Sequence, residues 1–472
     1  MTNPANTEPA ATAAQSWSLR ENARWLAGQF APSVVSFRAG VACAAVAIAI
    51  GFTHPVAMSL TEVLLGVMAF CWLLAGGYGE RLRAIRHNPV ALASLAMVAW
   101  MAFSTCYGQA PWGESLAVLA KYRNLVYLVL FVSIFRTEFL REAGLWFFFA
   151  AMTVTLLGSY LTAVGMPLFD GSYSGNPSNA TVFRNHIAQG LCMSLFAYLM
   201  AHHCVDYPRW RWITGPLALA ATWHVFGMLW CRTAYLTMAA LIIVFCIQRL
   251  RFRGLVLGAV AASLLAVAGY FLSDSFSERV HVTTDNVRGY LAYRFGDAPA
   301  TVEGGERPVT ETSSGYRLEW YRFGMKLFAE HPILGVGVGN PKHYMEAARE
   351  ETGIKPNENM HSEYVMALAQ NGLIGLGMLG VFMLIHWRVS RRLTPSMRYV
   401  AQGALVILVV AGVFNSILSE RSEGVLVAFC TGLAMAEYSQ HVIARRARQR
   451  RADGPRASLP EQVDAEPMAK AA

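Results

Sequence analysis

Blocks of about 20 apolar residues recur along most of the chain, and they constrain its fold more than any other feature. A helix of about 20 apolar residues is long enough to cross a lipid bilayer. Only 15% of the 472 residues are charged, whereas a soluble globular protein carries about 25%. The chain therefore cannot cover a water-facing surface, which excludes a soluble enzyme, a disordered protein and a secreted disulfide scaffold. We expect an all-α, polytopic membrane protein.

The number and charge of the apolar blocks predict about twelve transmembrane helices. The blocks lie at residues 35–52, 56–77, 89–106, 115–135, 142–164, 184–204, 212–230, 232–249, 254–272, 372–387, 399–418 and 424–441. Cytoplasmic loops of membrane proteins carry an excess of Lys and Arg. The loops at 53–55, 107–114 and 165–183 contain neither residue, whereas the short loops that alternate with them contain two or more arginines. This alternation places both termini in the cytoplasm.

The topology divides the chain into five regions. They are a cytoplasmic tail at 1–34, nine transmembrane helices over 35–272, one large outer loop at 273–371, three transmembrane helices over 372–441 and a basic cytoplasmic tail at 442–472. A connection as long as the outer loop is usually functional. We therefore expect the site to involve this loop.

The outer loop contains two segments with the spacing of short helices. Residues 317–330 alternate apolar and charged side chains at helical spacing, and His331-Pro332 ends the segment. Residues 361–370 form the second segment, with Asn359 as its candidate cap. Asn371-Gly372 predicts a break between this short helix and the tenth transmembrane helix.

His361 is the strongest candidate for a catalytic residue, because it begins the second short helix where the polar loop meets the membrane. Tyr364 follows on the same helical face at i+3. A histidine at this place can act as a general base near neutral pH. The alternative is an interfacial histidine whose ring bonds to water or to a lipid headgroup.

The first short helix carries Arg317 and Arg322 together with Trp320 and Tyr321. Trp and Tyr are common at membrane interfaces, and arginine at such a place suits a lipid-linked phosphate. The same pattern also fits an amphipathic helix that lies on anionic headgroups.

Five basic side chains lie inside apolar blocks or at their outer ends: Lys121, Arg123, Arg184, His186 and Arg232. A charge inside the membrane costs roughly 2.5–3.5 kcal/mol on insertion scales, so it indicates a functional role by default. The alternative for any one of them is a long side chain that reaches to the interface. That alternative explains all five less well, because this leaflet is otherwise poor in Lys and Arg.

Several kinds of site are missing from the sequence. It contains no Asp-x-Asp pair and no His-Glu-x-x-His, Gly-x-Ser-x-Gly or Walker A sequence. The GVGVG sequence at 335–339 does not fit the Gly-x-Gly-x-x-Gly pattern of dinucleotide binding. The loop histidines lack metal-ligand spacing, and the basic residues are spread between apolar blocks. We therefore expect no metal, no cofactor and no nucleic-acid partner.

Two stretches of the outer loop and one apolar block carry a recognisable pattern. The stretches are SSGYRLEWYRFGMKLFAEHPILGVGVGN at 313–340 and NMHSEYVMALAQNGLIGLGMLG at 359–380, and the block begins with CRTAYLTMAAL at 231–241. An Arg-Trp helix runs into a Gly-rich turn, and a later histidine motif enters a membrane helix. This pattern resembles the signature of the O-antigen ligase and polymerase superfamily of bacterial envelopes.

The resemblance implies roles for particular residues. His361 matches the essential loop histidine of the family. Arg317 and Arg232 match arginines that are expected to hold the diphosphate of the donor. Ser362 stands where asparagine is common in the family. The other basic candidates rest mainly on the topology argument.

The resemblance also implies a reaction at a membrane surface. The donor is a glycan on undecaprenyl diphosphate, and the acceptor is a sugar hydroxyl of lipid A–core. Both substrates share the outer leaflet of the bacterial inner membrane with its lipids, so the outer loop and the active site face the periplasm. The base is His361, and arginines neutralise the leaving diphosphate. We expect an O-antigen ligase that is inverting and metal-independent.

Three other functions remain open. An O-antigen polymerase uses the same donor but takes a second lipid-linked glycan as acceptor. A protein O-oligosaccharyltransferase acts on a pilin, and such relatives usually carry a longer C-terminal region. A membrane transporter or lipid flippase suits an even number of spans. The gathering of charges toward one leaflet favours an interfacial enzyme over a transporter.

Overall fold

The structure is a computed structural model of the chain, and it describes residues 34–166, 179–296 and 309–452. The predicted N-terminal tail lies outside the described residues except for position 34. Residues 453–472, which form most of the predicted C-terminal tail, also lie outside them.

Every predicted apolar block folds as a helix or as a pair of helices. The first of these helices are α2 (Val34–Val56), α3 (Met58–Leu74), α5 (Pro89–Ser104), α6 (Trp112–Lys121), α7 (Asn124–Ile134), α8 (Glu138–Ala163) and α9 (His186–Asp206). The predicted inner loop between the second and third blocks forms a further helix, α4 (Tyr78–Arg86). The later ones are α10 (Arg211–Met228), α11 (Arg232–Leu250), α12 (Phe252–Leu272), α17 (Glu363–Ser390), α18 (Pro395–Ala411) and α19 (Arg421–Ala452). They form the bundle that carries the outer loop.

The outer loop is itself largely helical. It contains α13 (Asp274–Phe295), α14 (Ser313–Glu330), α15 (Asn340–Ala347) and α16 (Arg349–Thr352). A short 3₁₀ turn, η2 (Val309–Glu311), precedes α14 in this loop. A second one, η1 (Pro208–Trp210), lies between α9 and α10 in the bundle. No strand occurs in the part of the chain that the structure describes, so the predicted all-α class is confirmed.

Five helices are long and apolar enough to cross a membrane: α2, α8, α11, α12 and α17. Two broken pairs pass the same test when each pair is taken as one span. They are α3 with α4, bent by 116°, and α6 with α7, bent by 40°. α5 and α18 are apolar but shorter. The helices of the described ranges therefore indicate a membrane protein with five to seven candidate spans, and the count of twelve stays a prediction.

The core of the bundle lies where α7 packs against α19. Phe131 of α7 and Phe135, the residue just after α7, meet Phe429 of α19 edge-on, with ring centroids 5.5 and 5.7 Å from that of Phe429. Such aromatic pairs contribute about 0.5–1.5 kcal/mol beyond the burial of their area. Gly432 permits the close approach, because a Cβ at this position would lie 2.4 Å from Cβ of Phe131. This packing fixes the start of α19, where part of the site lies.

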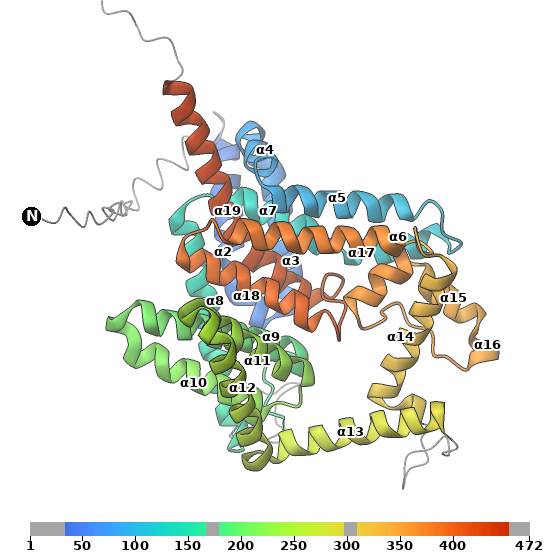
Figure 1. Ribbon diagram of the computed structural model, residues 1–472. Helices are drawn as coiled ribbons and strands as arrows, with labels where there is room; N and C mark the ends of the chain where they lie inside the picture. The colour runs from blue at the N-terminus through green and yellow to red at the C-terminus, as the bar shows by residue number, and fades with distance from the viewer. Residues whose placement is uncertain (1–33, 167–178, 297–308, 453–472) are drawn as a thin grey trace, which may run out of the picture.

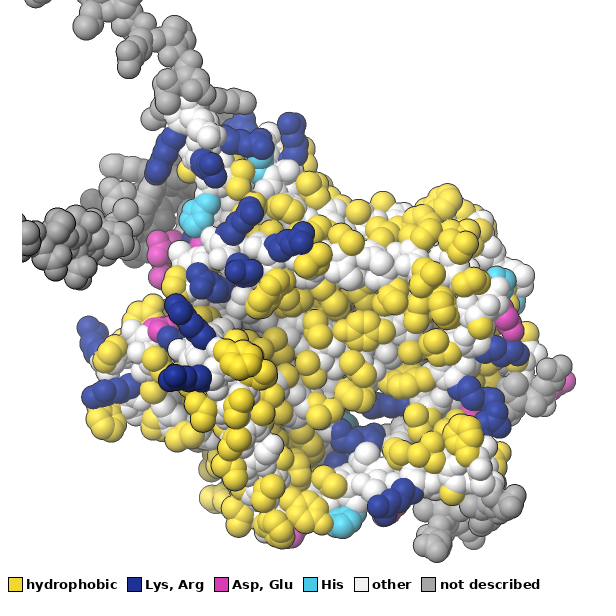
Figure 2. Space-filling model, in the orientation of Figure 1, with side chains coloured by type: hydrophobic (Ala, Val, Ile, Leu, Met, Phe, Trp, Pro, Cys, Tyr) yellow, Lys and Arg dark blue, Asp and Glu magenta, His cyan; other side chains and the backbone are white. Residues whose placement is uncertain are grey.

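The two ends of the bundle differ in charge and in structure. α4 and the C-terminal part of α19 lie at one end, whereas α13 to α16 lie at the other (Figure 1). Figure 2 shows hydrophobic side chains over most of the visible face between two zones of Lys and Arg. An apolar band between two charged zones is what a protein embedded in a bilayer presents.

The sequence does not predict α13, because polar and charged residues occur all around this helix. Its first turn is capped by Ser273, whose Oγ accepts a hydrogen bond from the Phe276 amide. Near its other end, the Tyr290 hydroxyl donates to Glu319 of α14 at 2.6 Å. These contacts connect α12 to α14 and place one face of α13 opposite the bundle.

The two predicted loop helices are present, with different boundaries. α14 begins four residues before the predicted start at 317. α17 begins two residues after His361, and its cap is Ser362, whose side chain accepts a hydrogen bond from an amide of the first turn. Asn359 instead accepts a hydrogen bond from the His361 amide. The predicted cap at Asn359 was wrong, because the chain makes a left-handed turn at His361 before the helix starts.

α17 is interrupted at Gly372, where a break is predicted, with φ +60° and ψ −153°. Just after the break, the Leu373 amide donates to the Pro332 carbonyl at 2.8 Å. Just before it, two α17 carbonyls accept hydrogen bonds from amides of the GVGVG turn. The loop thereby replaces the helical hydrogen bonds that the break removes, so the buried backbone groups stay paired.

Candidate active site

His361 lies in the turn before α17, and its backbone is left-handed at φ +51°. Asn359 Oδ1 accepts a hydrogen bond from the His361 amide at 2.7 Å, and the Tyr321 hydroxyl donates to the His361 carbonyl at 2.7 Å. A left-handed backbone costs a non-glycine residue about 1–2 kcal/mol. Residues held in such a conformation cluster at functional sites. Tyr321 and Asn359 therefore keep the histidine in a conformation that it would not adopt alone.

The imidazole of His361 has a fixed orientation. It stacks on the Trp320 indole with centroids 5.1 Å apart and planes 23° apart. Trp320 is anchored by its Nε1, which donates to the Lys355 carbonyl at 2.8 Å. Nδ1 of His361 lies 3.3 Å from Oδ1 of Asn415, on the connection between α18 and α19. Because an amide oxygen only accepts hydrogen bonds, this contact assigns the proton to Nδ1 and the lone pair to Nε2.

His361 is neutral at neutral pH. Burial and the nearby Arg317 guanidinium lower the pKa of His361 from 6.5 to about 4, while the hydrogen bond with Asn415 acts in the opposite direction. A neutral imidazole with a free Nε2 can accept a proton from a substrate. In the described part of the chain no hydrogen bond to Nε2 occurs.

Three arginines from three helices lie close to one another, and one of them, Arg317, lies close to this histidine. Arg232 is the first residue of α11, Arg279 lies on α13 and Arg317 lies on α14. Arg279 and Arg317 both act electrostatically on Arg232, and Arg279 acts on Arg317. Figure 2 shows Lys and Arg side chains around a hollow between α13 and the bundle. We call these three residues the arginine cluster.

The arginine cluster has no counter-ion in the ranges that the structure describes. None of its members forms an ion pair with a described Asp or Glu. Arg232 donates hydrogen bonds only to the hydroxyls of Thr283 and Ser314, at 3.3 and 2.8 Å. Nε of Arg279 is buried and has no described hydrogen-bond partner. Three neighbouring guanidinium groups without a described counter-ion could together neutralise a multiply charged anion.

His186 belongs to the same neighbourhood. It is the first residue of α9, and Asn185 caps this helix by accepting hydrogen bonds from two amides of the first turn. Arg279, Arg317 and Arg232 all act electrostatically on His186. The structure therefore brings together His186 and two of the predicted arginines, and it adds Arg279.

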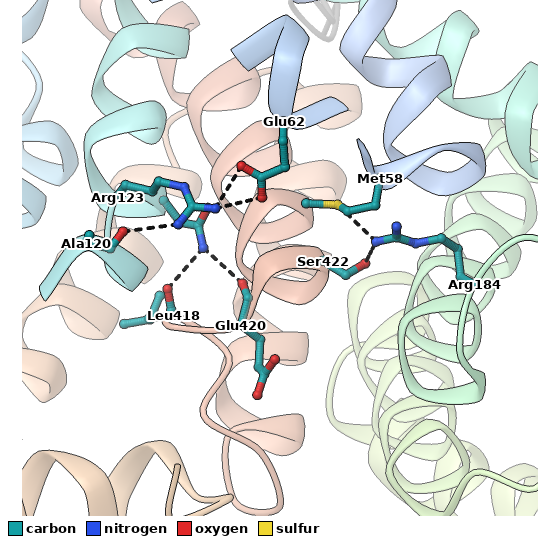
Figure 3. A network of polar contacts seen from close by, with 9 residues as sticks. Met58, Glu62, Ala120, Arg123, Arg184, Leu418, Glu420 and Ser422 are labelled. Atoms are coloured by element: carbon teal, nitrogen blue, oxygen red, sulfur yellow. Dashed lines mark hydrogen bonds and ion pairs between the residues drawn. The ribbon is translucent and has the colours of Figure 1, made fainter. Parts of the chain in front are cut away.

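The other three predicted cations lie in a separate cavity. Lys121 forms an ion pair with Glu358. Arg123 donates to both oxygens of Glu62 at 2.7 Å. Arg184 donates to Ser422 and to the sulfur of Met58. Figure 3 shows Arg123 with Glu62 on one side of the segment that carries Ser422, and Arg184 on the other. Two of these cations are thus already bound to carboxylates.

Two further predicted residues do not reach the imidazole. Arg322 is half-exposed and pairs with Glu319 at 3.1 Å. The Tyr364 hydroxyl donates to the Val409 carbonyl at 2.8 Å, which ties α17 to α18. Because the helix starts after His361, Tyr364 does not share a helical face with the histidine.

Arg279 and Asn415 were not among the predicted site residues. Arg279 is one of several arginines in the outer loop, and no motif distinguishes it from the others. Asn415 lies 54 residues after His361 in the sequence, so only the folded structure brings the two together. Among the described residues no group of three or more His, Cys, Asp or Glu side chains could hold a metal ion.

The fold and this site define a membrane protein in which a cluster of arginines lies close to a neutral histidine. Residues 217–380 match the protein-family model described as O-antigen ligase. This match includes the three stretches that carry the motif resemblance, and it supports the predicted O-antigen ligase superfamily. Members of this family are membrane glycosyltransferase-like ligases or polymerases. No curated protein matches the chain significantly.

The matched range, about a third of the chain, contains His361 and all three residues of the arginine cluster. Asn415 lies outside it, as do Lys121, Arg123 and Arg184. His186 also lies outside the matched range, although it lies near the arginine cluster.

Proposed function

We propose that the chain is an O-antigen ligase. It transfers a polysaccharide from undecaprenyl diphosphate to a sugar hydroxyl of lipid A–core. One observation carries this proposal: a neutral, oriented His361 lies beside an arginine cluster that has no described counter-ion. A general base and a diphosphate site are the two elements that this transfer requires.

The proposed reaction is a single displacement at the anomeric carbon. The acceptor oxygen forms a bond to that carbon while its proton moves to Nε2 of His361. The bond between the anomeric carbon and the donor phosphate oxygen breaks, and its electron pair leaves with undecaprenyl diphosphate. Attack opposite the leaving group inverts the anomeric configuration. His361 then releases its proton to the leaving diphosphate or to solvent.

The arginine cluster has two roles in this proposal. Arg232, Arg279 and Arg317 neutralise the charge that develops on the diphosphate, so the reaction needs no metal and no cofactor. Diphosphate binding also offsets the positive field of Arg317, which is one cause of the low pKa of His361. Donor binding therefore makes His361 a stronger base at the moment when a base is required.

The proposed location is the bacterial inner membrane, with the site facing the periplasm and membrane lipids around the bundle. The arrangement of charge supports it. The Arg-rich α4 and the C-terminal part of α19 lie at the opposite end of the bundle from α13 to α16 (Figure 1). Cytoplasmic ends are the Arg-rich ones. The twelve-span topology, with 273–371 as a periplasmic loop, is part of this proposal.

The test is a lipopolysaccharide gel from a strain that lacks this protein, complemented with the wild type, His361→Ala or His361→Asn. Asparagine tolerates the left-handed backbone better than alanine does, so it separates the loss of the base from backbone strain. A ligase gives bare core with polymer retained on undecaprenyl diphosphate, and only the wild type restores the ladder. Core capped with a single repeat unit identifies a polymerase instead, and normal ligation by His361→Asn refutes the base assignment.

A further inference from the structure

A cavity of about 730 Å³ lies beside the arginine cluster but is separate from it. It is lined mainly by the end of α6, the residues just before α9, Lys342 of α15, the segment before His361 and the start of α19. Volumes of about 300–1,000 Å³ are typical of small-molecule sites. The role proposed above for the arginine cluster does not use this cavity.

The lining of the cavity carries charges of both signs. Oε2 of Glu358 forms an ion pair with Lys121, and Oε1 of the same carboxylate lies 3.7 Å from Nζ of Lys342. These lysines lower the pKa of Glu358, so its carboxylate is ionised at neutral pH. Glu420 also faces the cavity and accepts a hydrogen bond from the Asn359 side chain. The rest of the lining includes three arginines, Glu423, several amides and hydroxyls, and apolar side chains such as Met58 and Phe183.

This lining differs in kind from that of the arginine cluster. A diphosphate placed in the cavity would meet Glu358 and Glu420, and three of the lining cations, Lys121, Arg123 and Lys342, already pair with carboxylates. Sugar hydroxyls both donate and accept hydrogen bonds, so they pair with carboxylates, amides and ammonium groups alike. A mixed, hydrogen-bonding cavity therefore suits an oligosaccharide rather than a diphosphate.

The cavity adjoins both parts of the candidate active site. Asn359 lines it and at the same time accepts the hydrogen bond from the His361 amide. Asn185 also lines it, and the next residue, His186, lies in the field of the arginine cluster. A ligand in the cavity is thus close to the turn that carries His361 and to the start of α9, next to the arginine cluster.

We propose that this cavity binds the oligosaccharide of the acceptor and presents its hydroxyl to His361. This inference rests on the proposed ligase function. The carboxylate of Glu358 and the ammonium of Lys342 hold sugar hydroxyls, while the donor diphosphate stays in the arginine cluster. Lys121, Arg123 and Arg184 then belong to the acceptor site and not to the diphosphate site.

The test compares Glu358→Gln and Lys342→Ala in the purified full-length protein. Ligation is measured with undecaprenyl diphosphate-linked glycan as donor and lipid A–core as acceptor. We expect both variants to raise the acceptor KM by roughly tenfold, because each removes a charged hydrogen-bonding group, and to leave the donor KM unchanged. If the cavity instead binds the anionic donor, the two variants change the donor KM in opposite directions. Glu358→Gln then lowers the donor KM, and Lys342→Ala raises it. That result, or an unchanged acceptor KM, overturns the proposal.

Lys326→Ala is the matched control, because Lys326 is exposed on α14 and pairs only loosely with Glu330 at 3.9 Å. It leaves both KM values at the wild-type level, and thermal unfolding of all three variants confirms that they fold. Calorimetry with delipidated core oligosaccharide gives a readout without turnover. Binding to the wild type that Glu358→Gln weakens supports the acceptor site even if the protein fails to ligate. No binding to the wild type, or equal binding to both, overturns it.

Discussion

Nδ1 of His361 lies 3.3 Å from Oδ1 of Asn415, although the two residues are 54 positions apart in the sequence. Two helices, α17 and α18, lie between them along the chain. This contact places the proton on Nδ1 of His361 and leaves Nε2 unbonded to any described residue, on the side of the ring away from Asn415. Asn415 is buried, so the orientation does not depend on a mobile surface side chain.

Replacing Asn415 with alanine is expected to reduce kcat roughly 10- to 100-fold, a part of the 10²–10⁴-fold that a general base contributes. The histidine remains, but its ring loses the partner that fixes its orientation. Steady-state kinetics check this, with both KM values expected to stay near the wild type. Asn415→Asp keeps an accepting oxygen at this position and should restore most of kcat. Equal kcat values for Asn415→Ala and the wild type would contradict the positioning role.

The pKa of His361 predicts an unusual pH dependence. The neutral imidazole is the active form, and its pKa of about 4 means that this form persists well below pH 6. Activity should therefore stay level from pH 7 to about pH 5 and fall as the pH approaches 4. Arg317→Gln removes a positive charge that disfavours the imidazolium, so the fall should move to higher pH. A pH profile of kcat/KM measures both effects, and a wild-type midpoint near 6.5 argues against them.

Arg279→Gln is expected to weaken donor use by at least tenfold, because it removes a charged hydrogen-bonding group from the diphosphate site. The same change relieves repulsion among three cations that have no counter-ion in the described ranges. The unliganded protein should therefore be as thermally stable as the wild type, or more so. Arg294→Gln, an exposed position on the same helix, is the control and should change neither property. A less stable Arg279→Gln protein with normal donor KM would show that Arg279 is structural.

Asn340→Ala is expected to lower the stability of the fold without removing any group of the candidate active site. The buried Asn340 Oδ1 accepts hydrogen bonds from the Gln109 and Ala110 amides at 2.6 and 2.7 Å. Each buried amide left without a partner costs about 1–3 kcal/mol. Thermal unfolding should show a lower Tm, whereas Asn286→Ala on the half-exposed face of α13 should not. An unchanged Tm would mean that water replaces the lost acceptor.

Sequence patterns predicted the helices well because apolar blocks and short amphipathic segments record local structure. The helix over 317–330 and the break at Gly372 are both present, at or near the predicted positions. α13 escaped prediction because its burial depends on contacts such as that of Tyr290 with Glu319, which no local pattern records. The cap of α17 was misplaced because the left-handed turn at His361 delays the start of the helix.

The candidate site was predictable only in part, for the same physical reason. In the sequence, the basic residues at the outer ends of the apolar blocks look equivalent. They differ only in the side chains that they contact in the folded protein. Lys121 pairs with Glu358, 237 residues later in the chain, whereas Arg232 meets two other arginines. Whether a cation is already neutralised is therefore a property of the tertiary structure. Motif resemblance found His361, Arg317 and Arg232, which all lie in the matched range.

The break at Gly372 has a consequence for which substrates can react. Hydrogen bonds across the break join the loop to the membrane helix on both sides, so the depth of His361 relative to α17 is fixed by the main chain. Under the proposed reaction, each lipid substrate must bring its reacting atom to that one height while its tail stays in the bilayer. The distance between the lipid anchor and the reacting hydroxyl then determines whether an acceptor can reach His361. Acceptors are sorted by reach as well as by the identity of their sugars.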